Sequence, residues 1–316
     1  MNTRRYALDP ELLPMADSLP TVMELSNPAV IAAMRSGPAM TGAAIPDRGD
    51  VHKEDLLVPG RAGDPDVPLR VYRPAGTSDS PSGCVLEIHG GGFMFGDIAM
   101  MDPWCQAVCG ELGAVVVSVE YRLAPEHRFP AALHDCHAAL CWVSANATRL
   151  GIDPARIVIA GQSAGAALAA STALYARDNG GPLPCFQLLE IPVMDDRLDT
   201  PSMRAFTDTP FWNLPNAEWG WKHYLGAACG GDVSPYAAPA RATDLGGLPP
   251  AYISTMEFDP LRDEGILYAL RLLQAGVAVE LHSFAGTFHG SSVINTARVS
   301  QRASAEIMTV LARALG

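Results

Sequence analysis

The chain has 316 residues, of which 48% are hydrophobic and 18% are charged, and this balance excludes a disordered or highly charged tail protein. Its 34 acidic and 22 basic residues give a net charge of −12, which argues against nucleic acid or an anionic membrane as the main partner. The seven cysteines form no C-x-x-C pair, so we expect reduced thiols in a cytoplasmic protein.

The N-terminal region, residues 1–50, carries six prolines and short amphipathic segments. Val22–Leu25 and Ala29–Met34 predict short helices, and no strand is expected in this region. The first 30 residues lack the unbroken apolar segment of a signal peptide, which agrees with a cytoplasmic protein.

From about residue 51 the chain alternates between apolar β-type segments and helical segments. Val67–Arg73 alternates like an edge strand. The other predicted strands are Cys84–Ile88, Ala114–Val119, Arg156–Ala160, Phe186–Ile191, Ala251–Thr255 and Val277–Ser283. The predicted helices are Asp102–Leu112, Ala131–Leu150, Ala164–Asn179, Leu261–Ala275 and Ser292–Leu315. This alternation predicts a mainly parallel sheet with helices on both faces.

One segment, Ile157–Ala176, has 20 residues without a charge and is long enough to cross a bilayer. It contains Gly161, Gln162 and Ser163, and it is rich in alanine rather than in large aliphatic residues. We therefore interpret it as a strand, a tight turn and a buried helix, with no membrane contact.

Within that segment, Gly161-Gln162-Ser163-Ala164-Gly165 is a G-x-S-x-G pattern. The pattern alone is common, but here it follows an apolar strand and opens a helix of small residues. A nucleophile on a sharp strand-to-helix turn needs this context, because the strained turn admits only small neighbours. Ser163 is therefore the candidate nucleophile; a turn without chemistry is the alternative.

A second glycine-rich stretch, His89-Gly90-Gly91-Gly92, follows an earlier predicted strand. It does not complete the G-x-G-x-x-G pattern of dinucleotide sites, and the chain contains no phosphate-binding loop. Glycines allow backbone N–H groups to point at a substrate oxygen. The N–H groups of Gly91 and Gly92, together with that of Ala164, fit an oxyanion hole.

A serine nucleophile needs a base and an acid that orients the base. His289 lies in a loop after the last predicted strand, and Asp259 directly follows the strand before it. The order of nucleophile, acid and histidine favours Asp259 over the alternatives Asp195 and Asp196. His134 and His137 flank Cys136 on a predicted helix, which is a weak indication of a metal site.

These motifs together resemble the hormone-sensitive lipase family of esterases. The resemblance rests on HGGGF at residues 89–93, YRLAPE at 121–126, GQSAG at 161–165, DPLRDE at 259–264 and FHG at 288–290. It is strongest to bacterial carboxylesterases of the heroin-esterase type. Two residues depart from the commoner G-D-S-A-G-G form of the family, namely Gln162 and Ala166.

The resemblance implies an α/β-hydrolase fold with a mostly parallel eight-stranded sheet, short-chain ester substrates and no cofactor. It also implies a helical cap made of residues 1–50 and 196–235, with the core in 51–195 and 236–316. Members of the family often dimerise through their last strands, so a homodimer is a candidate assembly. An amidase or N-deacetylase with the same triad, or a non-catalytic ligand-binding protein of the same fold, are the alternative functions.

Aromatic residues are concentrated in the region that interrupts the alternation, about 195–235. Six of them fall within 19 residues, namely Phe206, Phe211, Trp212, Trp219, Trp221 and Tyr224. We expect Phe211 and Trp212 to line the substrate pocket, with Phe93 and Phe95 beside the glycine loop as further candidates. Ordinary packing of an inserted helix is the alternative.

Overall fold

The computed structural model describes residues 6–21, 23–35, 47–76 and 80–316. Its centre is an eight-stranded sheet in the order β1-β2-β4-β3-β5-β6-β7-β8. The strands are β1 (Val51–Val58), β2 (Val67–Pro74), β3 (Ser82–Ile88), β4 (Val115–Val119), β5 (Ile152–Gln162), β6 (Phe186–Glu190), β7 (Ala251–Phe258) and β8 (Val279–Phe288). β2 is antiparallel to both β1 and β4, and all other pairs are parallel. The predicted mostly parallel sheet is confirmed.

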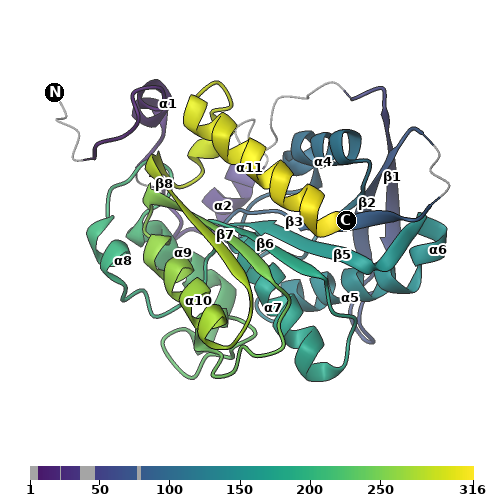
Figure 1. Cartoon of the computed structure of the whole chain (residues 1–316). Coiled ribbons are helices and arrows are strands. Elements are labelled where there is room, and N and C mark those ends of the chain that lie inside the picture. The colour runs from purple at the N-terminus through teal and green to yellow at the C-terminus, as the bar shows by residue number, and fades with distance from the viewer. Residues whose placement is uncertain (1–5, 22, 36–46, 77–79) are drawn as a thin grey trace.

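Helices cover both faces of this sheet (Figure 1). They are α1 (Leu13–Ser18), α2 (Pro28–Arg35), α4 (Ile98–Leu112), α5 (Ala131–Ala145), α6 (Ala147–Leu150), α7 (Ala164–Asn179), α8 (Pro201–Ala205), α9 (Leu214–Leu225), α10 (Arg262–Gln274) and α11 (Arg298–Leu315). Short 3₁₀ turns lie at Gly226–Ala228, Pro239–Arg241 and Ser291–Val293. Residues of α4 and α11 pack on one face of the sheet, and residues of α5, α7 and α10 pack on the other.

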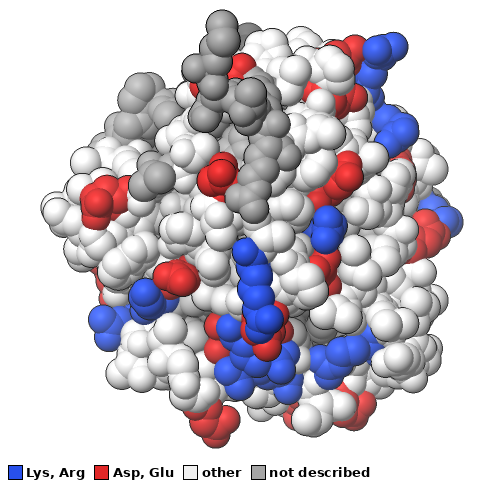
Figure 2. Space-filling view, turned by 90° about the vertical axis from the view of Figure 1, so that its left-hand side faces the viewer, with Lys and Arg blue, Asp and Glu red and all other residues white. Residues whose placement is uncertain are grey.

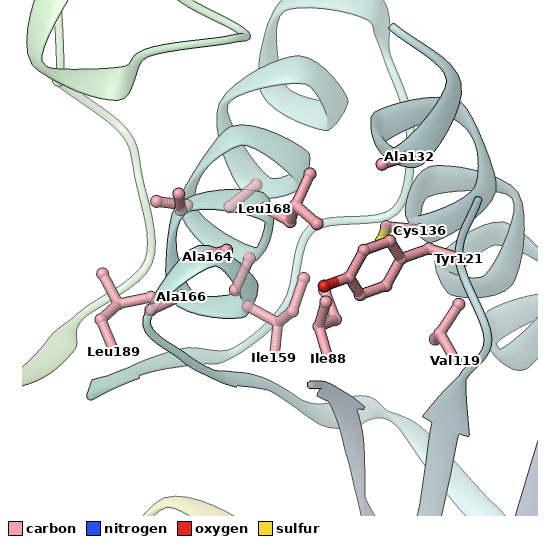
Figure 3. Packing of buried hydrophobic residues seen from close by; sticks show 14 of the residues in the cluster. Ile88, Val119, Tyr121, Ala132, Cys136, Ile159, Ala164, Ala166, Leu168 and Leu189 are labelled. Atoms are coloured by element: carbon pink, nitrogen blue, oxygen red, sulfur yellow. The ribbon is translucent and has the colours of Figure 1, made fainter. Parts of the chain in front are cut away.

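The central strands read as continuous apolar runs because helices bury both of their faces. All five residues of β4 are buried, for example. On the side of α7, Ala164, Ala166 and Leu168 lie close to Ile159 and Leu189 of the sheet (Figure 3). The small side chains at the start of α7 let this helix approach the sheet closely, so that its first turn follows β5 directly.

Three local expectations were wrong. Val67–Arg73 belongs to β2, which is not the edge strand, because β1 pairs along its outer side. The sequence pattern does not predict β1, because most of its side chains reach solvent and it carries three charged residues. Residues 23–25 are not helical, and Val22 lies outside the described residues. The last long helix begins at Arg298 rather than at Ser292, after the turn at Ser291–Val293.

The apolar segment Ile157–Ala176 divides as expected into the end of β5, the turn at Ser163 and most of α7. In the part of the chain that the structure describes, none of the helices is long and apolar enough to span a membrane.

The N-terminal segment and the aromatic region around α8 and α9 contact each other. The Phe211 N–H donates to the Pro20 carbonyl over 3.0 Å, and the Asn213 side-chain amide donates to the Thr21 carbonyl. Nε2 of His223 lies 2.7 Å from the carbonyl oxygen of Leu25. On this side of the molecule acidic and basic side chains are interspersed over a mostly uncharged surface (Figure 2).

Candidate active site

Ser163 occupies the turn between β5 and α7, with backbone angles φ 57° and ψ −118°. A residue with a side chain rarely adopts this conformation, so the surrounding hydrogen bonds must hold it. The Ser163 N–H donates to the Glu190 carbonyl over 2.8 Å, and the Ser163 carbonyl accepts from the Val193 N–H over 3.3 Å. The backbone at the end of β6 and just after it thus fixes the turn and presents the Ser163 hydroxyl at the carboxyl end of β5.

The glycines of the G-x-S-x-G pattern are required by close backbone contacts. A Cβ atom at Gly165 would collide with the carbonyl oxygens of Ile88 and His89. A Cβ atom at Gly161 would collide with the backbone of Gly165. The pattern therefore allows the start of α7 to lie directly against the end of β3.

Ser163, His289 and Asp259 form a continuous chain of contacts. Ser163 Oγ lies 3.0 Å from His289 Nε2, and His289 Nδ1 lies 2.7 Å from Asp259 Oδ2. All three side chains are buried, with Asp259 1% exposed and His289 4% exposed. Asp259 follows β7 and His289 follows β8, so the ends of these neighbouring parallel strands bring two residues 30 positions apart together. Ser163, which follows β5 in the same sheet, is 126 positions from His289.

The acids considered as alternatives to Asp259 pair elsewhere. Asp195 binds Arg197, and Asp196 accepts from Nε and Nη2 of Arg241 at 2.6 and 2.9 Å. Neither contacts His289 in the hydrogen bonds of the described residues. The geometry thus selects Asp259.

The glycine loop lies beside Ser163. A Cβ atom at Gly90 would be 3.5 Å from the Cβ of Ser163. Gly91 and Gly92 have φ angles of 120° and 59°, where glycine is favoured. Within the described residues, no backbone acceptor pairs with the N–H of either glycine. The N–H of Ala164, the first residue of α7, has no acceptor within its own helix. Among the described residues, the backbone hydrogen bonds thus leave the N–H groups of Gly91, Gly92 and Ala164 without an acceptor.

His89 supports this loop from the core. Its Nδ1 lies 2.8 Å from the Gly90 carbonyl oxygen, and its ring stacks on Tyr121 at 4.2 Å between centroids. The Tyr121 hydroxyl donates to the His89 carbonyl over 2.9 Å. Burial lowers the pKa of His89 to about 4, so the imidazole is neutral at neutral pH. His89 therefore orients the loop and is too far inside the core to exchange a substrate proton.

The predicted pocket aromatics divide into two groups. Trp212 lies against the glycine loop and the histidine: a Cβ atom at Gly92 would be 2.5 Å from its ring, and its ring centroid is 6.0 Å from that of His289. Phe211 lies 3.3 Å from the Cβ position of Gly290. Phe93 instead stacks on Tyr224 at 4.0 Å, and Phe95 is buried in the main core. Positive φ angles occur at Phe93, Phe211 and Ser163, so this site contains several residues with strained backbone conformations.

Comparison with known proteins agrees with this geometry. A family model described as alpha/beta hydrolase fold matches residues 85–292. The chain belongs to the α/β-hydrolase family. It is 38% identical to esterase LipI of Mycobacterium tuberculosis, over 90% of this chain and 88% of that protein. It is 39% identical to carboxylesterase NlhH of the same organism, over 90% and 89% of the two chains.

Solved structures of esterases resemble this hydrolase over nearly the whole chain. A bacterial heroin esterase superposes with a TM-score of 0.92 at 53% identity, covering 98% of both chains. Esterase LipW from Mycobacterium marinum gives a TM-score of 0.83 at 39% identity, covering 98% of this chain and 96% of that one. The family resemblance inferred from the sequence motifs is confirmed.

The histidines around Cys136 do not converge on a common point in this hydrolase. His134 Nδ1 lies 3.0 Å from Asp64 Oδ2, whereas His137 lies beside Cys141 and Cys136 is buried in the core. The described residues contain no group of three or more histidine, cysteine or acidic side chains placed to hold a metal ion.

Sequence reasoning left one buried residue of the site without a role. Glu264, in the first turn of α10, accepts from the Met194 N–H over 2.6 Å and the Asp195 N–H over 3.4 Å. Burial raises its pKa well above the ordinary value. It connects the loop of Asp259 to the segment after β6. Its position five residues after Asp259 indicates a place near the site, but only the structure shows which groups it contacts.

Proposed function

We propose that this hydrolase is a serine carboxylesterase that cleaves short-chain carboxylic esters. The observation that carries the proposal is the buried contact chain from Ser163 through His289 to Asp259, beside three backbone N–H groups that have no backbone acceptor among the described residues. Relatives named esterase or carboxylesterase over about nine-tenths of the chain support it.

Each of the three side chains has a distinct part in the proposed reaction. The Ser163 hydroxyl attacks the ester carbonyl while His289 Nε2, 3.0 Å away, takes its proton. Asp259 holds the other ring nitrogen, which keeps the reactive tautomer and stabilises the imidazolium. His289 then protonates the leaving alcohol, and water hydrolyses the acyl-enzyme with His289 again as the base.

The N–H groups of Gly91, Gly92 and Ala164 form the proposed oxyanion hole. Negative charge develops on the former carbonyl oxygen in each tetrahedral intermediate, and fixed donors stabilise it without reorganising. The positive φ angles of Gly91 and Gly92, and the place of Ala164 directly after Ser163, support this assignment. No cofactor takes part in any step of the scheme.

Replacing the nucleophile is the direct test. Ser163→Ala should lower kcat on p-nitrophenyl acetate by roughly a million-fold and abolish labelling by a fluorophosphonate. Ser171→Ala, which changes a buried serine on the same helix α7, is the matched control and should keep wild-type activity. If Ser163→Ala kept more than about a hundredth of the rate, another nucleophile would be at work. Pairing this ester with the corresponding anilide separates an esterase from an amidase.

The substrate pocket is proposed to lie beneath a cap made of residues 1–50 and 196–235, of which residues 1–5, 22 and 36–46 lie outside the described part of the chain. Contacts between the segment around Pro20 and the segment around Phe211 support a single covering layer. Trp212 and Phe211, which adjoin the glycine loop and the histidine loop, limit the space for the acyl chain. A buried methylene contributes about 0.8 kcal/mol, so chains gain affinity only while space remains. Rates should therefore peak between acetyl and hexanoyl esters.

Aromatic substitutions test this pocket. Trp212→Ala and Phe211→Ala should move the optimum to longer acyl chains with little change on acetate, measured with p-nitrophenyl esters from acetate to palmitate. Trp219→Ala is the matched control, because Trp219 is in the same region but stacks on His223. An unchanged chain-length profile with a lower melting temperature in both variants would make these residues packing elements, and would move selectivity to the side of Phe93 and Phe95.

The proposal extends to compartment and assembly. All seven cysteines are free thiols, four of them buried, which supports work in a reducing compartment such as the cytoplasm. The partner is a small-molecule ester, and a homodimer is the assembly that the family resemblance suggests. Size-exclusion chromatography with light scattering measures the assembly.

A further inference from the structure

Arg35, the last residue of α2, reaches from the N-terminal segment to the glycine loop. Its Nε donates to the Met94 carbonyl and its Nη2 donates to the Ala124 carbonyl, both over 2.6 Å. Its two terminal nitrogens also pair with the Glu126 carboxylate at 3.1 and 3.0 Å. One guanidinium thus binds the glycine loop and the YRLAPE segment together, and the proposed reaction assigns a role to neither contact.

The first contact connects to one proposed oxyanion donor, the Gly92 N–H, through two peptide units. The Met94 carbonyl, which Arg35 binds, belongs to the same peptide unit as the Phe95 N–H. That N–H donates to the Gly91 carbonyl over 2.8 Å. The Gly91 carbonyl in turn shares its planar peptide unit with the N–H of Gly92. Because C=O and N–H of a trans peptide point in opposite directions, holding the carbonyl fixes where the Gly92 N–H points.

The second contact leads to the same carbonyl by another route. Arg35 binds the carbonyl of Ala124, and the N–H of Ala124, in the adjoining peptide unit, donates to the Phe93 carbonyl over 2.9 Å. The Phe93 carbonyl shares a peptide unit with the Met94 N–H, which donates to the Gly91 carbonyl over 3.0 Å. Both routes from Arg35 therefore end on the carbonyl behind the Gly92 N–H.

We infer that Arg35 is a positioning residue of the oxyanion hole, acting through the peptide units of Phe93–Phe95 on the Gly92 N–H. The inference rests on the proposed esterase function. Hydrogen bonds in such a chain polarise and orient one another, and a charged donor at its start strengthens the series. The N-terminal segment would then contribute to the reaction rate as well as covering the pocket.

Arg271 provides a matched control for the chemistry of this contact. It lies on α10 and its guanidinium donates to the carbonyls of Ala240 and Ala242, so it too joins a helix to two backbone carbonyls. It contacts neither the glycine loop nor the N-terminal segment in the hydrogen bonds of the described residues. A purely structural role for Arg35 predicts that Arg35→Met and Arg271→Met behave alike.

The experiment measures kcat and KM on p-nitrophenyl acetate and the inhibition constant of a short alkyl trifluoromethyl ketone, whose serine hemiketal carries an oxyanion. Losing a whole oxyanion donor costs about a hundred-fold or more in kcat, so a donor that stays but loses its orientation should cost about tenfold. Arg35→Met should therefore lower kcat about tenfold with KM nearly unchanged, and weaken the ketone by a similar factor. Arg35→Lys should restore part of both losses. Arg271→Met should change the melting temperature alone.

Two results would overturn the inference: an Arg35→Met enzyme with wild-type kcat and ketone affinity, or a slower enzyme whose ketone affinity is unchanged. If Arg35→Met does not fold, kcat and the ketone inhibition constant are measured on Arg35→Lys and Glu126→Gln instead. The lysine has a shorter reach to the two carbonyls, and the glutamine removes only the carboxylate that pairs with the guanidinium. Failure of the proposed function is a different result, because the wild-type protein itself would then not hydrolyse the ester.

Discussion

The ends of β6 and β7 carry the same kind of residue with different consequences. Asp196, after β6, and Asp259, after β7, each have a side chain only 1% exposed. Asp196 binds the guanidinium of Arg241, whereas Asp259 binds the imidazole of His289. A guanidinium does not release its proton in proteins, but an imidazole exchanges protons near neutral pH. The partner, and not the burial of the acid, decides which of the two can serve catalysis.

A third buried acid extends the comparison to β3. Glu87 has only the Ser118 hydroxyl as a partner, at 2.5 Å, and one of its oxygens has no partner among the described residues. Burial raises the pKa of Glu87 to about 8, with repulsion from Glu190 and Glu120 adding to the effect. Glu87 therefore holds its proton at neutral pH.

The largest difference should separate Asp259 from Asp196 in the rate. Asp259→Asn should lower kcat on the order of ten thousand-fold, because the amide favours the histidine tautomer that cannot accept the Ser163 proton. Asp196→Asn should cost far less in kcat, since Asp196 has no contact with His289. Steady-state rates on p-nitrophenyl acetate measure both, and the reverse ranking would assign the acid to the end of β6.

A smaller effect should appear in the stability of the Asp196 variant. Asp196→Asn replaces one partner of a mostly buried, two-bonded ion pair with a neutral amide. Loss of such a charged hydrogen bond costs about 1 to 3 kcal/mol in the free energy of unfolding. Urea unfolding at neutral pH measures this cost. An unchanged midpoint would mean that the pair between Asp196 and Arg241 contributes nothing to the fold.

A third effect concerns Glu87 and depends on pH. Its folded pKa is raised from 4.5 to about 8, so the folded state binds more protons than the unfolded state between these values. Its contribution to stability is therefore complete below about pH 4.5 and is lost as the pH rises toward 8. Glu87→Gln cannot ionise, so its stability relative to wild type should grow with pH, by at most about 1.4 kcal/mol per unit. Melting curves of both proteins from pH 5 to 8 test this; a constant difference would contradict it.

The elements that bring the site together could be predicted because strong local patterns mark them. Ser163 and Asp259 each follow an apolar strand segment and His289 follows β8, and the ends of these parallel strands meet at one edge of the sheet. β1 could not be predicted this way, because it pairs only with β2 and its mostly solvent-facing residues show little periodicity. The roles proposed for Gly91, Gly92 and Ala164 also follow from their motifs, and they stay predictions until the oxyanion experiments are done.

Other features lie beyond any local pattern. That Trp212 lies over Gly92 depends on how the segment around residue 211 is held by the backbone at Pro20. Arg35 has no neighbour in the sequence that signals its contacts with Met94 and Ala124, which are 59 and 89 residues away.

The amino-acid sequence by itself determined the alternating strands and helices, the glycine turn at Ser163 and the chain order of nucleophile, acid and histidine. These follow from short-range rules, since side-chain periodicity and the steric freedom of glycine act over a few residues. Only the tertiary structure decided which buried acid meets His289, which aromatic rings adjoin the glycine loop, and that Arg35 binds behind it. Those outcomes depend on contacts between residues far apart in the chain, and their geometry exists only once the sheet and its helices have packed.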